Sequence, residues 1–127
     1  MISVMISGMV NEYREAVIPV VFVSQTGDEA GIEAVIDTGF SGDVTLPVEQ
    51  AEALELTWLG REPGVLANGH IELFDVYWGT VIWDGMRRVV EVAAAEAQPL
   101  VGMNLLDGHS IRIEVVIGGA VEIASLP

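Results

Sequence analysis

The chain contains the stretch Ala34-Val35-Ile36-Asp37-Thr38-Gly39-Phe40-Ser41-Gly42, an apolar run that ends in a single acid and continues into a turn with two glycines. Apolar residues recur at every second position before the acid, which predicts a half-buried strand over residues 31–36. Gly39 and Gly42 are expected to adopt backbone angles that other residues resist. A carboxylate at the mouth of such a turn is costly to desolvate, and this cost makes Asp37 a candidate for chemistry.

Two further motifs follow this stretch in order. Leu66-Ala67-Asn68-Gly69 lies in the middle of the chain, and Leu100-Val101-Gly102-Met103-Asn104-Leu105-Leu106 lies near its end. With Asp37-Thr38-Gly39 they resemble the retropepsin-like aspartic proteases, and most closely the small single-domain bacterial type, over most of the chain. A bare Asp-Thr-Gly arises by chance in roughly a few per cent of chains of this length, so the order and spacing of the motifs carry the resemblance.

The resemblance implies an all-β fold, a closed retropepsin-like β-barrel with one or two short helices, formed by residues 1–127 as a single domain. It implies an aspartic endopeptidase that hydrolyses peptide bonds in a polypeptide substrate and uses no cofactor and no metal. The catalytic residues are then Asp37, Thr38 and Gly39. The substrate-binding residues are Phe40, Ser41, Ala67, Asn68 and Gly69, of which the last three belong to a flap over the bound peptide.

Only one acid of the chain lies in the context that this chemistry needs. Two carboxyl groups about 3 Å apart share one proton, so that one acts as a base and the other as an acid. The remaining aspartates and the acid pair Asp28-Glu29 lack the strand and the following Thr-Gly. We therefore expect an Asp37/Asp37' dyad across a homodimer. The resemblance further implies that the two chain termini lie in an intersubunit sheet.

The resemblance also assigns roles to neighbouring residues. The Thr38 hydroxyl bonds across the dimer axis, Gly102 lies behind the active loop where a side chain would collide, and Asn104 matches an Asn of the retroviral motif. Three departures bear on efficiency and substrate range: Phe40 replaces a small residue, Met103 stands where retroviral enzymes often carry Arg, and the flap has a single glycine.

Composition limits the remaining possibilities. The chain has 127 residues, a net charge of -14, 51% hydrophobic residues and no cysteine. A charge of this sign repels nucleic acid, the absence of thiols excludes disulfides, and no apolar run approaches the roughly 18 residues that span a bilayer. We expect one cytoplasmic domain without membrane insertion, whose apolar surface is covered in a dimer.

Local patterns predict a mainly β chain. Hairpins are expected at Asn68-Gly69, as a two-residue type I′ turn, and at Asp84-Gly85. One helix is expected over residues 45–54 with Thr45 as its N-cap, and a short helix from Met103 to Gly108. Strands are expected over 1–10, 16–24, 31–36, 44–46, 71–83, 86–94, 111–117 and 121–126, with Pro19 marking an edge position or a bulge.

Other interpretations are open at this point. A noncatalytic dimeric peptide-binding or scaffolding module would retain the fold without turnover, and an unrelated β-barrel would carry the motifs by chance as a stable monomer. Asp37 would then cap its own loop. His70 and His109 are interpreted as surface or turn residues. The substitution Asp37→Asn distinguishes the peptidase from the binding module, because it abolishes cleavage in an enzyme and changes only binding in a module.

Overall fold

The computed structural model describes residues 5–127, which form strands and two short helices. The helices are α1 (Val48–Ala53) and α2 (Met103–Leu106). The strands are β1 (Met5–Val10), β2 (Ala16–Val23), β3 (Glu29–Ile36), β4 (Val44–Leu46), β5 (Thr57–Val65), β6 (Ile71–Trp83), β7 (Met86–Ala94), β8 (Leu100–Val101), β9 (His109–Ile113) and β10 (Ala120–Ser125).

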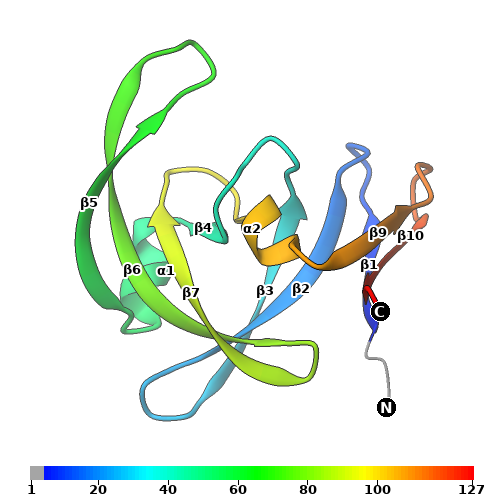
Figure 1. Cartoon of the computed structure of the whole chain (residues 1–127), viewed down its shortest axis with the longest axis horizontal. Helices are drawn as coiled ribbons and strands as arrows, with labels where there is room; N and C mark the ends of the chain where they lie inside the picture. The colour runs from blue at the N-terminus through cyan, green and yellow to red at the C-terminus, as the bar shows by residue number, and fades with distance from the viewer. Residues whose placement is uncertain (1–4) are drawn as a thin grey trace.

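Part of the sheet closes on itself. Neighbouring strands follow the order β6-β7-β4-β8-β3-β2, and β2 pairs again with β6, which completes a ring. Strand β5 lies outside this ring on β6, and β1, β10 and β9 extend from β2 (Figure 1). The expectation of an all-β closed barrel with one or two short helices is therefore confirmed, and the helices number two within residues 5–127.

The core fills the inside of the ring. In β2, the alternate residues Ile18, Val20 and Phe22 are at most 1% exposed, and Val81 of β6 and Val92 of β7 are fully buried. Period-2 burial follows because successive side chains of a strand point to opposite faces. Each such side chain stabilises the fold by about 1.5–3 kcal/mol, so the ring is a rigid support for its loops.

Pro19 lies inside the sheet rather than at its edge. It pairs with Glu33 of β3 on one side. On the other side, β1 pairs with β2 only as far as Val17, and β6 pairs with β2 only from Val21 onwards. A residue without an N–H fits this interval between two neighbouring strands, because no ladder bond is required of it there.

The first helix starts later than the sequence predicts. Helix α1 begins at Val48 with Pro47 as its N-cap, and Thr45 is a buried residue of β4. The Thr45 hydroxyl oxygen accepts a hydrogen bond from the Leu100 N–H at 3.0 Å. Parallel pairing with β7 keeps β4 extended. Leu46 directly precedes Pro47 and is therefore kept out of the helical region, so no helix can start behind Thr45 and Thr45 cannot serve as the cap.

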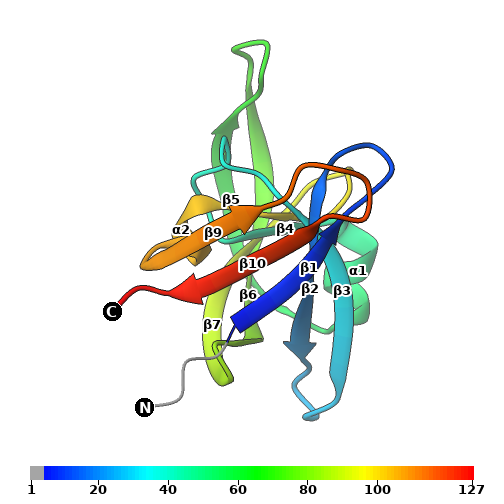
Figure 2. The same cartoon turned by 90° about the vertical axis from the view of Figure 1, so that its right-hand side faces the viewer.

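The two terminal strands pair with each other within one chain. Strand β1 runs antiparallel to β10 from Met5↔Ala124 to Met9↔Ala120, and β9 completes the layer beyond β10 (Figure 2). The part of the predicted first strand over residues 1–4 lies outside the described residues. The intersubunit sheet stays a prediction.

Strand β9 is shorter than predicted because its hairpin turns early. The chain leaves the ladder after Ile113, and the Glu114 N–H donates to the Ala120 carbonyl at 2.9 Å to close the loop. The side chains of Val115, Val116 and Ile117 are therefore exposed at the tip of this loop, at 62–65%.

In the part of the chain that the structure describes, neither helix has the length or apolar character needed to cross a bilayer.

Candidate active site

Asp37 follows the last residue of β3 and is held from both sides. Strand β3 pairs in parallel with β8, and the Asp37 N–H continues this ladder by donating to the Val101 carbonyl at 2.9 Å. The Gly39 N–H donates to Asp37 Oδ1 at 2.9 Å, and the Phe40 N–H donates to the Asp37 carbonyl at 3.2 Å. The half-buried carboxylate is thus fixed within a tight turn, while Thr38 and Gly39 are exposed on the surface of the single chain.

The second motif packs directly behind this turn. The Met103 N–H donates to the Phe40 carbonyl at 2.8 Å, and the Asn104 N–H donates to the Gly42 carbonyl at 3.1 Å. A Cβ atom on Gly102 would lie 2.3 Å from the Gly42 carbonyl oxygen. Gly102 therefore occupies the position expected for it, where any side chain collides with the Asp37 loop, defined as residues 37–43.

Gly42 is required for space rather than for an unusual backbone angle. Neither Gly39 nor Gly42 has a positive φ, contrary to the expectation from the sequence. A Cβ on Gly42 would lie 2.6 Å from the Phe40 ring, and one on Gly102 would lie 2.5 Å from it. The half-buried Phe40 ring thus packs across both glycines. Its role in substrate binding, like that of the exposed Ser41, stays a prediction.

Asp43 is a residue of this site that the sequence analysis set aside. It is 9% exposed, and its two carboxylate oxygens accept from different elements. Oδ1 accepts from the Asn104 side-chain amide at 2.7 Å, and Oδ2 accepts from the Glu91 N–H of β7 at 3.0 Å. The sequence signal that points to it is an acid followed directly by the buried strand Val44–Leu46, since a buried carboxylate needs hydrogen-bond partners.

The hairpin formed by β5 and β6 has a different tip from the predicted one. The Leu66 N–H donates to the His70 carbonyl at 2.7 Å and the Gly69 N–H donates to the Leu66 carbonyl at 2.9 Å. Gly69 has φ +85°, whereas Asn68 has no positive φ and accepts the His70 N–H on its side chain. This is a three-residue loop with a bulge at the glycine, instead of a two-residue type I′ turn.

Two adjacent positive-φ residues do occur at the other predicted hairpin. Asp84 and Gly85 have φ values of 54° and 74° and connect Trp83 directly to Met86. The hairpin predicted there is confirmed, and its backbone has the positive angles that a type I′ turn requires.

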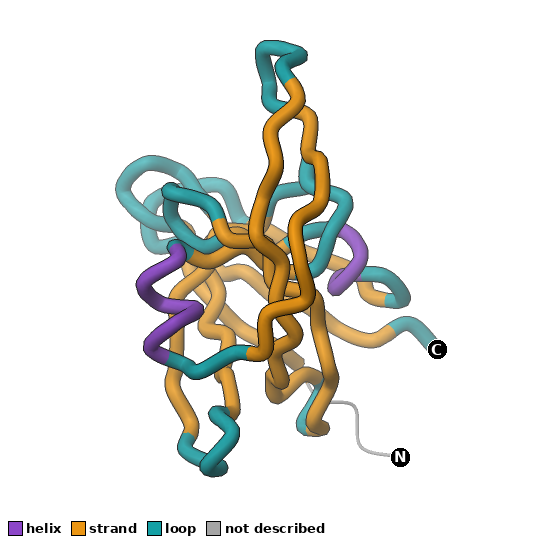
Figure 3. The backbone as a smooth tube through the Cα atoms, turned by 90° about the vertical axis from the view of Figure 1, so that its left-hand side faces the viewer, coloured by secondary structure: helices purple, strands orange, loops and turns teal. Residues whose placement is uncertain are grey.

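The β5–β6 hairpin projects from the ring at the end where the Asp37 loop lies (Figures 1 and 3). Ala67, Asn68 and Gly69 are exposed at its tip. Near the tip, Val65 pairs with Ile71, and both are more than 70% exposed. The role of this hairpin as a flap stays a prediction.

The distal part of one face of the hairpin is apolar. Ile71 and Leu73 lie two-residue steps away from the buried Tyr77 of the same strand, so these side chains point to the same side of β6. This side faces the core farther along the strand. Asp75, ion-paired with Arg61 of β5, lies between Leu73 and Tyr77 on this same side, so the exposed apolar surface is limited to the distal part of the hairpin.

An acid joins the two arms of the hairpin near its base. Asp75 Oδ1 of β6 accepts from the Trp58 indole N–H at 3.1 Å and from the Arg61 Nε–H at 3.2 Å, both from β5. The Trp58 hydrogen bond, followed by the contribution of Arg61, lowers the pKa of Asp75 below its usual range. This contact fixes one arm against the other next to the bulge between Trp58 and Gly60.

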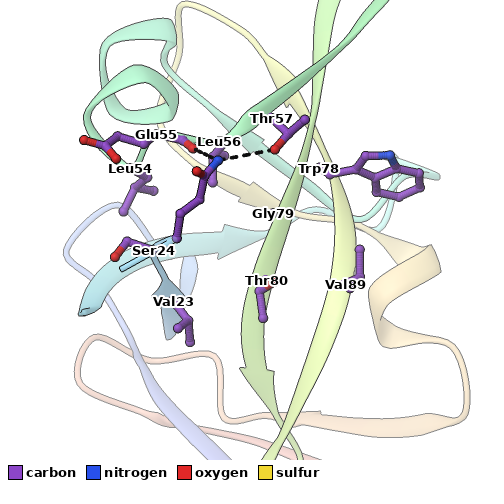
Figure 4. A pocket seen from close by; sticks show the side chains of 11 residues that line it. Val23, Ser24, Leu54, Glu55, Leu56, Thr57, Trp78, Gly79, Thr80 and Val89 are labelled. Carbon is purple, nitrogen blue, oxygen red and sulfur yellow. Dashed lines mark hydrogen bonds between the residues drawn. The ribbon is translucent and has the colours of Figure 1, made fainter. Parts of the chain in front are cut away.

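A surface cavity lies away from the Asp37 loop. It has a volume of about 210 Å³ and is bordered by the β2–β3 turn, the end of α1 and the outer face of β6 (Figure 4). The Gln25 amide spans it, donating to the Glu55 carbonyl at 2.8 Å and to the Thr57 hydroxyl at 3.4 Å. Gln25 precedes the start of β3, whereas Asp37 follows its end, so this cavity is separate from the candidate site.

His109 is more deeply placed than a surface or turn residue. Its side chain is 6% exposed, and Nε2 lies 2.6 Å from Asp84 Oδ2. Nδ1 lies 2.9 Å from the Asp107 carbonyl oxygen, and the ring contacts Trp83 edge-on at 5.7 Å. The ring thus connects the β6–β7 turn to the end of α2. No group of three or more potential ligands for a metal ion occurs within residues 5–127.

Comparison with known proteins identifies the fold. No family model matches the chain, and no curated protein matches it. Among solved structures, a retropepsin-like aspartic protease from Rickettsia conorii matches with a TM-score of 0.61 and 19% sequence identity, over 98% of this chain and 95% of that chain. The chain therefore has the retropepsin-like fold that the motifs predict, over nearly its whole length.

Proposed function

We propose that the protein is an aspartic endopeptidase that is active as a homodimer, in which Asp37 of each copy supplies one carboxyl group. The observation that carries the proposal is the position of Asp37. In a retropepsin-like fold, it emerges from a core strand into a turn clamped by the second motif, beside an exposed Thr38 and Gly39.

The dimer is required by the chemistry. Peptide hydrolysis needs a base for the attacking water and an acid for the carbonyl oxygen. The loop of one copy supplies a single carboxylate, whose Oδ1 is already bonded to the Gly39 N–H. Two such loops facing each other across a two-fold axis bring two carboxyl groups together, and Thr38 is exposed where the second copy must approach.

The dyad carries one shared proton. The ionised carboxylate takes a proton from water as the water oxygen bonds to the carbonyl carbon, and the protonated carboxyl gives its proton to the carbonyl oxygen. Proton transfer to the amide nitrogen then accompanies breakage of the C–N bond. Because this cycle needs one proton on the pair, cleavage is expected to be fastest in acid. The β5–β6 hairpin covers the extended substrate.

The test compares the parent chain with its Asp37→Asn variant. Both are incubated with a complex peptide mixture from pH 3 to pH 7 at several protein concentrations, and new peptide termini are identified by mass spectrometry. Asp28→Asn, in the exposed β2–β3 turn, is the matched control. Cleavage by the parent and the control but not by Asp37→Asn, with activity per chain that rises with concentration, supports the proposal.

Cleavage that survives Asp37→Asn refutes the aspartic mechanism. If the parent does not cleave at any pH or concentration but both proteins retain peptides in a binding assay, the chain is a peptide-binding module with the same fold. A stable monomer that neither binds nor cleaves refutes both functions.

A further inference from the structure

We propose that Asp43 is a positioning residue of the active site, which fixes the Asp37 loop against α2 and β7 and thereby sets the turnover rate. The inference rests on the proposed peptidase function. Asp43 does not act on the substrate itself. It acts through the loop that carries Asp37.

The two ends of the Asp37 loop are held by two consecutive residues. Val101 accepts the Asp37 N–H at one end, and the Gly102 N–H donates to the Asp43 carbonyl at the other end, both at 2.9 Å. The path of the loop between these anchors is therefore determined by how residues 101–104 sit. Any shift of this segment moves Asp37.

The Asp43 side chain locks this segment in place. Its Oδ1 holds the Asn104 side chain at 2.7 Å, while the Asn104 N–H bonds to the Gly42 carbonyl, so Asn104 is tied to the loop through both its side chain and its backbone. Oδ2 holds the Glu91 N–H, one residue before β7 begins its parallel pairing with β4 at Val92. Loop, helix and ring thus meet at one carboxylate.

A carboxylate is the only side chain of this size that suits both partners. Both of its oxygens are acceptors, and the two groups that face them are donors. An amide at position 43 presents one acceptor and one donor, so one of the two N–H groups faces another N–H. Misplacing a catalytic group by about 1 Å lowers turnover on the order of 100-fold, so a modest repulsion at Asp43 is enough to affect the rate.

The test uses a reciprocal exchange. Asp43→Asn and Asn104→Asp each introduce a mismatch, the first between two N–H donors and the second between two carboxylates. In the double variant Asp43→Asn/Asn104→Asp, the amide at 43 accepts from the Glu91 N–H and donates to the carboxylate at 104. We expect kcat to fall at least about tenfold in each single variant, KM to change less than about threefold, and the double variant to regain most of the lost kcat.

Turnover is measured for each variant at protein concentrations where activity per chain is constant, and folded fractions are measured by circular dichroism at the same temperature. Asp107→Asn makes the same chemical change at an exposed position and is expected to match the parent. If the single variants are too unstable to assay, the folded double variant decides alone: parent-like kcat supports the inference, and a kcat as low as about one tenth overturns it.

Other results separate this inference from the proposed function. A folded Asp43→Asn variant with parent-like kcat, or a double variant no better than the single ones, overturns the positioning role while peptidase activity stands. Reduced thermal stability with unchanged kcat per folded chain assigns Asp43 a structural role only and also overturns the inference. A parent chain that does not cleave refutes the proposed function, and the inference falls with it.

Discussion

Replacing Gly102 with alanine places a methyl group in the tightest contact behind the Asp37 loop. The new Cβ would lie 2.3 Å from the Gly42 carbonyl oxygen, 2.5 Å from Phe40 Cδ2 and 2.8 Å from the Phe40 carbonyl oxygen. Ordinary Cβ contacts begin at 3.4 Å, so the methyl group and the Gly42 oxygen must separate by about 1.1 Å. Two of the three atoms belong to the backbone, so a side-chain rotation cannot relieve the contact.

The expected cost follows from this displacement. Overpacking of this kind destabilises a protein by about 1–3 kcal/mol, and the loss of glycine freedom in the unfolded chain returns about 0.4–1 kcal/mol. Because two of the close atoms are backbone, the overpacking cost is expected at the upper end of its range. After the glycine contribution is subtracted, we expect Gly102→Ala to lower the free energy of unfolding by about 2 kcal/mol. Because the displaced loop carries Asp37, turnover is expected to fall on the order of 100-fold.

Urea denaturation at one protein concentration measures the first effect, and peptide cleavage measures the second. Gly31→Ala is the matched control, since a Cβ there has no atom within 4 Å and Gly31 lies in β3 without a positive φ. The control is expected to gain stability or remain within about 0.5 kcal/mol of the parent. If Gly102→Ala unfolds within that same margin of the parent and cleaves normally, the tight packing behind the loop is refuted.

Three further outcomes follow from the hairpin and its base. Replacing Trp58 with Phe removes the indole N–H, so the pKa of Asp75 should rise toward its ordinary value in a carboxyl NMR titration. In the parent, the lowered pKa of Asp75 stabilises the fold above the unfolded value, and this contribution is lost as the pH falls through the folded value. Burial, followed by the charges of nearby acids, raises the pKa of Tyr77, so alkaline ultraviolet titration should show late ionisation, with stability lost as the pH rises above the unfolded tyrosine value. Leu73→Ser should raise KM for apolar peptides without a large change in thermal stability. Val89→Ser, also 63% exposed but on the outer face, should leave KM unchanged, and equal effects of the two variants would contradict the flap role of the hairpin.

The fold and the loop around Asp37 were predictable because local patterns and tertiary structure agree there. The apolar residues at every second position before Asp37 predicted a strand. The second motif predicted that Gly102 lies behind the Asp37 loop. Thr45 was misplaced because capping preference is local, whereas pairing of β4 with β7 depends on residues far along the chain. Asp43 was missed for the same reason: its partners, Glu91 and Asn104, are 48 and 61 positions away.

The positions of the two hairpins were predictable, whereas the conformation of the turn was predictable in only one of them. Asn68-Gly69 and Asp84-Gly85 both predicted hairpins, and both occur. Only the second has positive φ at both residues, because the Asn68 side chain instead accepts the His70 N–H and stays outside the left-handed region. The dipeptide therefore predicted the reversal of the chain, while the loop length depended on a hydrogen bond that the pattern does not encode.

The clamp of the Asp37 loop by Val101 and Gly102 also sets an order of events during synthesis. Residues 37–43 leave the ribosome long before residues 101–104, and until the later segment arrives, the loop lacks the carbonyl and amide groups that hold its ends. Contacts of such long sequence separation are slow to form, because closing the intervening chain costs entropy before the contact stabilises the fold. A growing chain therefore has no ordered Asp37 loop, and the candidate catalytic centre is assembled among the last parts of the molecule.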